Sequence, residues 1–180
     1  FAFEPNPKIF KELEKNKFVK KNENIKLFNF GLGKEKEKKE LKTFIDSSSS
    51  TFSSIDKNTE YYKRKKKYLG IFSNDIFSQN YLVNLYPLSD LVKKYSIPKI
   101  DILKIDTEGF ELNVLKGLNN NELNIFRFIY FEHHYDLMLK KGYTFFDINS
   151  FLKKRNFEPK YKLKMNCRKT FEYIYERQEK

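Results

Sequence analysis

The feature that most constrains the fold is a run of mainly β-branched apolar residues at positions 100–106, bounded by Pro98 and Gly109. A run of this kind is typical of a central parallel strand that is buried on both faces. Directly after it, Phe110 and Val114 recur at the four-residue spacing of an amphipathic helix. A buried strand followed at once by a helix predicts a parallel α/β sheet.

The same alternation extends along the chain, and 39% hydrophobic residues suffice for one core. The pattern predicts strands at residues 1–3, 25–30, from 81, 100–106 and 125–131, and helices at residues 8–17, 88–92 and 145–154. Residues 161–165 and 171–175 are expected to close the sheet as an antiparallel pair. We therefore predict one α/β domain over residues 1–180, with a Rossmann-like, mostly parallel sheet and helices on both faces.

Residues 34–80 interrupt this pattern with charged, serine-rich and lysine-rich stretches, so we expect a loop-rich insertion with one strand at residues 41–45. The serine run at residues 46–54 is compatible with a flexible linker or with a loop on the substrate side of the site. The lysine run at residues 63–67 could contact an anionic substrate or a membrane surface.

The composition indicates in which compartment the protein is located and which kinds of partner it binds. The net charge of +12 comes mostly from lysines scattered over every segment, which is typical of solvated surfaces, so nucleic-acid binding is not favoured. No apolar run approaches the roughly 20 residues of a membrane span, and the start lacks a signal-peptide pattern. One cysteine, Cys167, excludes an internal disulfide. We expect a soluble, cytoplasmic protein, and the sequence contains no signal for an oligomeric state.

Polar residues follow the predicted strands. Glu4 follows the first strand, Gly31-Leu32-Gly33 the second, Asp106-Thr107-Glu108 the central strand and Glu132-His133-His134 the next one. In open α/β sheets, ligands bind outside the carboxyl ends of the strands. These residues are therefore expected to meet at one rim of the sheet and to form a ligand site.

Two of these segments resemble a known family. Residues 102–117, which read ILKIDTEGFELNVLKG, and residues 3–7, which read FEPNP, are similar to motifs of the FkbM-type methyltransferases and follow in the family's order. The resemblance extends over residues 1–135 and is weakest across residues 34–80. It implies a seven-stranded Rossmann-like sheet, S-adenosylmethionine as methyl donor, and a hydroxyl of a sugar or other small metabolite as acceptor.

The resemblance also implies a strand and a glycine-rich turn before Phe1, and both are missing from this sequence. Because the sequence starts at Phe rather than Met, we expect residues 1–180 to be a processed chain or a fragment. The missing turn would pass close to the methionine part of the cofactor, since glycine lets backbone approach a ligand. Gly31-Leu32-Gly33 lies after the following strand and is expected to border the adenine instead.

The cofactor residues have structural alternatives. A carboxylate at Glu4 can accept hydrogen bonds from both ribose hydroxyls, or it can stabilise a helix N-terminus. Pro5 and Asn6 join it in the proposed cofactor segment because they match the family motif. Asp106 would face the sulfonium and methyl region of the donor, and its alternative role is a helix N-cap.

The remaining candidates concern the acceptor. On a continuing strand Glu132 and His134 share one face and His133 lies on the other, so we favour His134 over His133 beside Glu132. Methyl transfer to an alcohol requires a base, which one of these residues, Asp106 or Glu108 could supply. A histidine pair with Asp106 or Glu108 would also suit a divalent metal, an alternative that we do not favour. Glu108 could equally be a first-turn acid, and the histidines could simply cap the strand.

Two other functions remain open. The chain could be a non-catalytic Rossmann-like binding module that lacks its cofactor turn. The lysine content also leaves an RNA-binding or RNA-modifying protein as a less favoured alternative.

Overall fold

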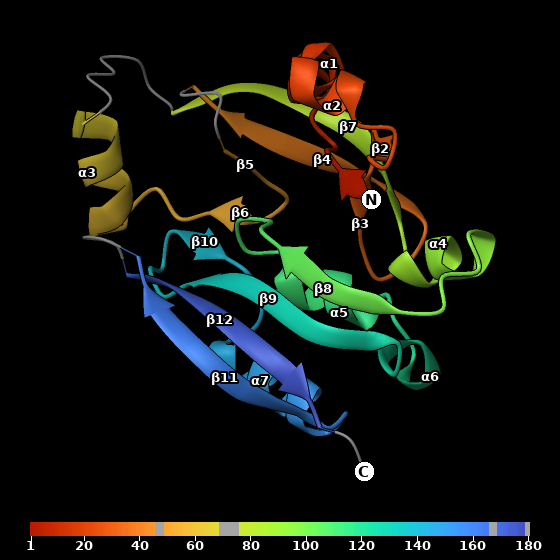
Figure 1. Ribbon diagram of the computed structural model, residues 1–180. Helices are drawn as coiled ribbons and strands as arrows, with labels where there is room; N and C mark the ends of the chain where they lie inside the picture. Colours follow the sequence, from red (N-terminus) through yellow and green to blue (C-terminus); the bar gives the residue numbers. More distant parts are fainter. Residues whose placement is uncertain (46–48, 69–75, 166–168, 179–180) are drawn as a thin grey trace.

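In the computed structural model, residues 1–45, 49–68, 76–165 and 169–178 are described, and they form a mixed α/β fold (Figure 1). Cys167 lies outside the described residues. The helices are α1 (Pro7–Lys15), α2 (Lys17–Lys21), α3 (Glu60–Tyr68), α4 (Leu88–Lys94), α5 (Glu111–Lys116), α6 (Asn120–Leu123) and α7 (Phe145–Lys153). The strands are β1 (Ala2–Phe3), β2 (Leu27–Phe28), β3 (Gly31–Leu32), β4 (Glu37–Phe44), β5 (Ser50–Thr51), β6 (Ser54–Ile55), β7 (Phe77–Tyr86), β8 (Ile100–Ile105), β9 (Phe126–His134), β10 (Leu139–Lys140), β11 (Phe157–Lys164) and β12 (Thr170–Arg177).

The sheet that carries the predicted central strand has the order β11-β12-β9-β8. Strand β8 runs parallel to β9, whereas β12 is antiparallel to both β9 and β11. The predicted α/β class and the antiparallel closing pair are therefore confirmed. The described strands nevertheless form several mixed sheets, and only the β8–β9 pair of this sheet is parallel.

A second sheet, with the order β3-β7-β4-β5, contains much of the region that we expected to be loop-rich. Strands β4 and β7 form a long antiparallel pair, and β6 pairs with β10. The sequence hides β4 because its first half is exposed and carries Glu and Lys side chains, while its buried positions begin only at Leu41. Gly31 and Leu32, expected in a turn, form the short strand β3 beside β7.

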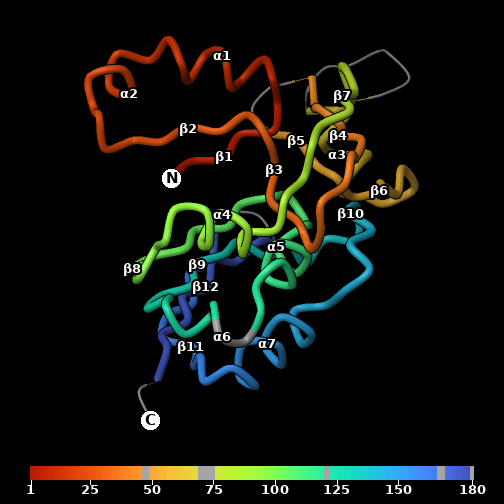
Figure 2. Tube along the Cα trace, turned by 90° about the vertical axis from the view of Figure 1, so that its right-hand side faces the viewer, coloured from red at the N-terminus to blue at the C-terminus, as the bar shows by residue number. Residues whose placement is uncertain are grey.

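The N-terminal elements form a small layer of their own. Strand β1 pairs in parallel with β2, and the helices α1 and α2 connect these two strands. Pro7 opens α1, because its fixed φ suits the first helical position. Figure 2 shows β1, β2, α1 and α2 grouped above β8.

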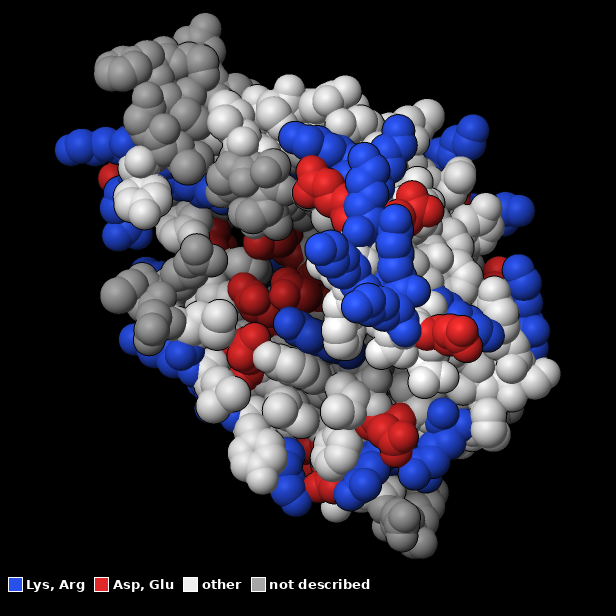
Figure 3. Space-filling model, turned by 45° about the horizontal axis from the view of Figure 1, so that its top comes forward, with Lys and Arg blue, Asp and Glu red and all other residues white. Residues whose placement is uncertain are grey.

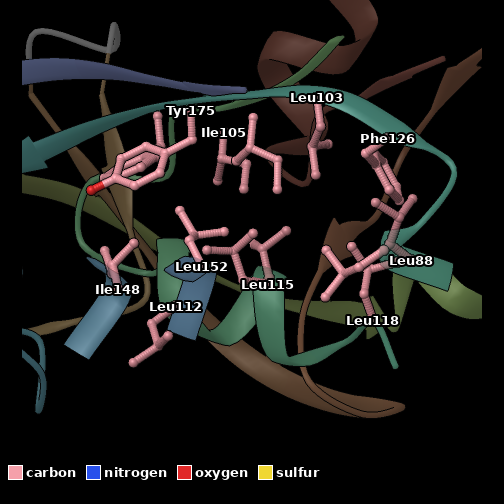
Figure 4. Close-up of a cluster of buried hydrophobic side chains, with 14 of the residues drawn as sticks. Leu88, Leu103, Ile105, Leu112, Leu115, Leu118, Phe126, Ile148, Leu152 and Tyr175 are labelled. Atoms are coloured by element: carbon pink, nitrogen blue, oxygen red, sulfur yellow. The ribbon is translucent and has the colours of Figure 1, made fainter. Parts of the chain in front are cut away.

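The main core lies between the β8–β9–β12 sheet and the helices α5 and α7, which are behind the sheet in Figure 1. Figure 4 shows Ile105 and Tyr175 from the sheet facing Leu115, Ile148 and Leu152 from the helices. Full burial of one such side chain stabilises the fold by about 1.5–3 kcal/mol. This packing fixes the positions at which β8 and β9 end, and hence the positions of the candidate site residues.

One expectation about the central strand is wrong, because β8 is not buried on both faces. Leu103 and Ile105 face the core, but Ile102 is 62% exposed and Lys104 is exposed as well. The physical reason is that α5 and α7 pack on the same face of the sheet, which leaves the alternate residues of β8 on the opposite, open face.

None of the helices in the described residues is long and apolar enough to cross a membrane.

Candidate active site

A cavity of about 450 Å³ lies between the ends of β1 and β8. Glu4, which directly follows β1, and Asp106, which directly follows β8, both line it. Gly31, Leu32 and Phe52 contribute further wall residues. The cavity therefore runs along both strands and reaches their carboxyl ends, where ligands bind in α/β sheets.

The Glu4 carboxylate is held in a fixed position. Its Oε1 accepts a hydrogen bond from the backbone N–H of Asn6 at 2.7 Å, while the Glu4 backbone carbonyl accepts one from Asn29 Nδ2 at 2.9 Å. Burial raises the pKa of Glu4 above its ordinary value, although the Asn6 hydrogen bond opposes this effect. The carboxylate is thus partly desolvated, which strengthens any hydrogen bond that it makes to a ligand.

The other proposed cofactor residues divide into two groups. Pro5, Gly31 and Leu32 line the cavity, and a Cβ at Gly31 would lie 2.6 Å from Leu85 Cδ2, so a larger residue there would displace the Leu85 side chain. Asn6 is committed elsewhere, since its side chain caps α1 by accepting hydrogen bonds from the N–H groups of residues 8 and 9. Gly33 packs against Leu85 and the ring of Phe110 and is not among the lining residues.

Asp106 directly follows β8 and lines the cavity. Burial raises its pKa, and the negative charge of Glu132 raises it further, whereas Lys104 at 3.5 Å lowers it. Asp106 and Glu132 come directly after Ile105 and Phe131, which are paired across the parallel strands, so the two carboxylates lie on the same face. A carboxylate with a raised pKa is a better proton acceptor than an ordinary one.

The loop between β8 and α5 has an unusual backbone. Glu108 and Gly109 both adopt positive φ angles, of 49° and 94°. The fully buried Glu111 carboxylate stabilises the loop by accepting hydrogen bonds from Gly109 N at 2.8 Å, Thr107 Oγ1 at 2.9 Å and the Tyr143 hydroxyl. As a result the Glu108 side chain is directed towards β9 rather than into the first turn of α5.

His134 is the centre of a cluster of carboxylates and is only 5% exposed. Its Nε2 lies 3.0 Å from Glu108 Oε2 and 3.1 Å from Glu132 Oε1, and its Nδ1 lies 3.6 Å from Asp136 Oδ2. Nε2 makes no well-aligned hydrogen bond to a single oxygen. It lies between two carboxylates, so we regard the contact as ionic. Thr170 Oγ1, at 3.2 Å from Nδ1, completes the surroundings.

The contacts within this cluster determine the protonation states of its residues. Burial alone would lower the pKa of His134, but the contacts with Asp136, Glu108 and Glu132 outweigh burial and raise the pKa to about 12. For Glu108 and Asp136, burial works against ionisation, yet the contact with His134 lowers both pKa values. His134 is consequently an imidazolium at neutral pH, a state in which it cannot accept a proton.

His133 is separated from this cluster. It faces the core, is 2% exposed, and its ring packs against the rings of Tyr135, Tyr143 and Phe145. Burial, reinforced by the charge of Lys141, lowers the pKa of His133 to about 3. The two adjacent histidines therefore have opposite protonation states, because a strand places neighbouring side chains on opposite faces.

Sequence reasoning missed several neighbours of the site. Asp136 belongs to the His134 cluster and stands only two residues further along the chain, so a search for acids near the histidine pair could have found it. Thr170 reaches His134 through the β9–β12 register, and Lys104 pairs with Asp106, two residues further along the chain. The Thr170 contact leaves no local signal in the sequence.

The space-filling view shows how charge is distributed on this side of the molecule. Figure 3 shows Asp and Glu side chains gathered in a hollow, with Lys and Arg side chains on the surface beside it. The acidic hollow is notable in a chain of net charge +12. Among the described residues, no group of three or more His, Cys, Asp or Glu side chains is arranged to hold a metal ion.

Comparison with known proteins identifies the family. The family model for the methyltransferase FkbM domain matches residues 1–159. This range includes both sides of the cavity and the whole of β9. A search of curated proteins and a search of solved structures gave no match. Since the family model covers most of the sequence, the chain belongs to the FkbM methyltransferase family.

Proposed function

We propose that this chain acts as an S-adenosylmethionine-dependent O-methyltransferase on a hydroxyl group of a sugar or another small metabolite. The family supports methyl transfer as the reaction class. The observation that carries the proposal is that Glu4 and Asp106, at the ends of two different strands, line one cavity. A carboxylate for the ribose and a carboxylate for the reacting centre thus face the same space.

Several residues of the cavity fit the cofactor. Glu4 has one carboxylate oxygen fixed by Asn6 N, and its other oxygen can accept a hydrogen bond from a ribose hydroxyl. Gly31, Leu32 and Phe52 provide a largely apolar wall that suits the adenine. When bound, the cofactor supplies an electrophilic methyl group on a sulfonium sulfur.

Asp106 is our choice for the base that accepts the proton of the acceptor hydroxyl. Burial and Glu132 raise its pKa, which brings the carboxylate closer to the basicity that proton transfer requires. The cofactor, held by Glu4, Gly31 and Leu32, would supply the methyl group, and Asp106 would accept the proton of the acceptor hydroxyl. His134 is a cation and is better suited to hold Glu108 and Glu132 in place beside the acceptor.

We also propose that a strand outside residues 1–180 completes the cofactor site. Among the described strands, β1 pairs with β2 and β8 pairs with β9, while the remaining edges of β1 and β8 border the cavity. A strand placed between them would fill the part of the cavity that runs along residues 2–3 and 102–105, and would leave the part beside Glu4 and Asp106 to the ligand. It would join the two sheets and continue into the glycine-rich turn that the family resemblance implies. This arrangement would also give the single Rossmann-like sheet that the sequence predicts.

The proposal is tested by calorimetry of the complete protein with S-adenosylmethionine, followed by measurement of S-adenosylhomocysteine release with a panel of monosaccharides and hydroxylated metabolites. Release with one acceptor class, and its loss in an Asp106→Asn variant, is the expected result. Cofactor binding without any release would favour the non-catalytic binding module. If the complete protein does not bind the cofactor, the proposed function is wrong.

A further inference from the structure

The inserted region contributes a short segment that touches both loops of the candidate site. Residues 49–56, which we name the brace, comprise β5, β6 and their flanking residues. On one side the brace contacts the loop that carries Glu108. On the other side it contacts the segment that follows His134.

The contacts with the Glu108 loop are hydrogen bonds from buried hydroxyls. Thr51 Oγ1 donates to the backbone carbonyl of Glu108 at 2.7 Å, and Ser53 Oγ donates to the carbonyl of Gly109 at 2.9 Å. Thr51 is fully buried and Ser53 is 6% exposed. Ser49 also forms a hydrogen bond with the Glu108 carboxylate that lowers its pKa.

The Thr51 and Ser53 hydroxyls bind the backbone at the two residues with positive φ angles. Glu108 has a positive φ, which is unfavourable for a residue with a side chain, and Gly109 follows it with another. A conformation of this kind persists only when its surroundings hold it. Thr51 and Ser53 satisfy the two carbonyls of this bend, and the bend in turn directs Glu108 Oε2 to within 3.0 Å of His134 Nε2.

The other end of the brace is tied to the residues after β9. Strand β6 pairs with β10, and Asp56 N donates to the carbonyl of Met138 at 2.8 Å. The Asp56 carboxylate also lies 3.5 Å from Lys140 Nζ. Asp136, the His134 partner on the Nδ1 side, belongs to the same connection between β9 and β10.

We infer that Thr51 and Ser53 are positioning residues of the candidate active site and that the brace sets the distance between Glu108 and His134. This inference rests on the proposed function, since it deepens the account of that same site. The inserted region is then a part of the catalytic apparatus and not only a linker. The charged groups that face His134 are Glu108, Glu132 and Asp136, with Lys141 at its backbone carbonyl.

The test uses Thr51→Val, Ser53→Ala and the double variant of the complete protein. Thr43→Val is a matched control, because Thr43 is a buried threonine of the same region whose hydroxyl donates to a backbone carbonyl, that of Gln79 at 2.6 Å, away from the site. Thr51→Ser keeps the hydroxyl and should restore wild-type behaviour. Melting temperature reports the general structural cost of each change.

The specific measurement is the pH titration of the His134 ring by NMR, with a His133→Gln background to assign the two histidine signals. In the double variant, withdrawal of Glu108 should lower the pKa of His134 by about one pH unit, since a nearby opposite charge shifts a pKa by about 1–3 units. Turnover should fall by up to about a hundredfold while cofactor affinity stays within about twofold, because misplacement affects the chemical step.

Thr43→Val should lower the melting temperature but leave the His134 titration unchanged. The inference is overturned if the double variant titrates like Thr43→Val and keeps its turnover. It is also overturned if Thr51→Ser behaves like Thr51→Val. The titration needs no cofactor. Failure of the protein to transfer methyl groups would refute the proposed function, but the titration would still test whether the brace positions Glu108. Ser53→Ala alone provides the same comparison if the double variant does not fold.

Discussion

We expect Glu4→Gln to weaken binding of S-adenosylmethionine without disturbing the fold. Glutamine has nearly the same size as glutamate, and its amide oxygen can still accept the hydrogen bond that Asn6 N donates to Glu4 Oε1 at 2.7 Å. The turn into α1 should therefore persist. What the substitution removes is the negative charge that faces the cavity.

The expected loss follows from the hydrogen bonds that the carboxylate can make. Hydrogen bonds to charged groups contribute about 1.5–3 kcal/mol each, and the amide retains part of one of them. A net loss of about 2–3 kcal/mol corresponds to roughly 30- to 150-fold weaker binding. Partial burial of Glu4 supports the upper part of this range, because desolvation strengthens charged hydrogen bonds.

The pH dependence gives an independent check. Burial raises the pKa of Glu4 above its ordinary value, and protonation would remove the negative charge that strengthens a hydrogen bond from the ribose. The affinity for S-adenosylmethionine should therefore be highest well above this raised pKa and should decline as the pH falls through it. This decline should begin at a higher pH than it would for an ordinary glutamate. The Gln variant should lack this decline.

Calorimetry with S-adenosylmethionine and with S-adenosylhomocysteine measures both effects in the complete protein. Glu12→Gln, an exposed charge removal on α1, serves as the control and should bind like the wild type. Unchanged affinity of Glu4→Gln across the pH range would refute the ribose assignment. Equal losses in both variants would show that the effect is not specific to the cavity.

Three further results are expected. Asp106→Asn should lower turnover by about 10²- to 10⁴-fold with little change in cofactor affinity, as loss of a general base does; near-native turnover, measured by S-adenosylhomocysteine release, would exclude Asp106. Because burial lowers the pKa of His133 from 6.5 to about 3, His133 should reduce the stability of the wild type by between about 1 and 2 kcal/mol from pH 6.5 to 5, where the unfolded state binds the extra proton. Urea unfolding of His133→Gln should lack this slope, and an unchanged slope would refute burial as its cause. Gly117→Ala should destabilise the fold by about 2 kcal/mol or more in the same assay, because its Cβ would lie 2.2 Å from the Gly33 carbonyl oxygen; wild-type stability would contradict that packing.

Elements with a strong local signal could be predicted from the sequence. The helix at Pro7–Lys15 and the closing strands appear close to their expected positions, because proline, apolar spacing and alternation act over a few residues. The strands β4 and β7 could not be placed in the same way. Lysine and glutamate in β4, and serine, glutamine and asparagine in β7, occupy exposed positions and conceal the alternation. Only the mutual pairing of the two strands buries the remaining side chains.

The candidate site shows the same division. The sequence by itself identified the family motifs, placed Glu4 and Asp106 at strand ends, and separated His133 from His134, since alternation along a strand is a local property. The tertiary structure alone decided that Glu108 lies beside His134 and Glu132, and that Thr51 and Ser53 hold the Glu108 loop. These contacts join residues from different strands and loops, and the charge of each group depends on burial and on neighbours that only the folded chain brings within a few ångströms.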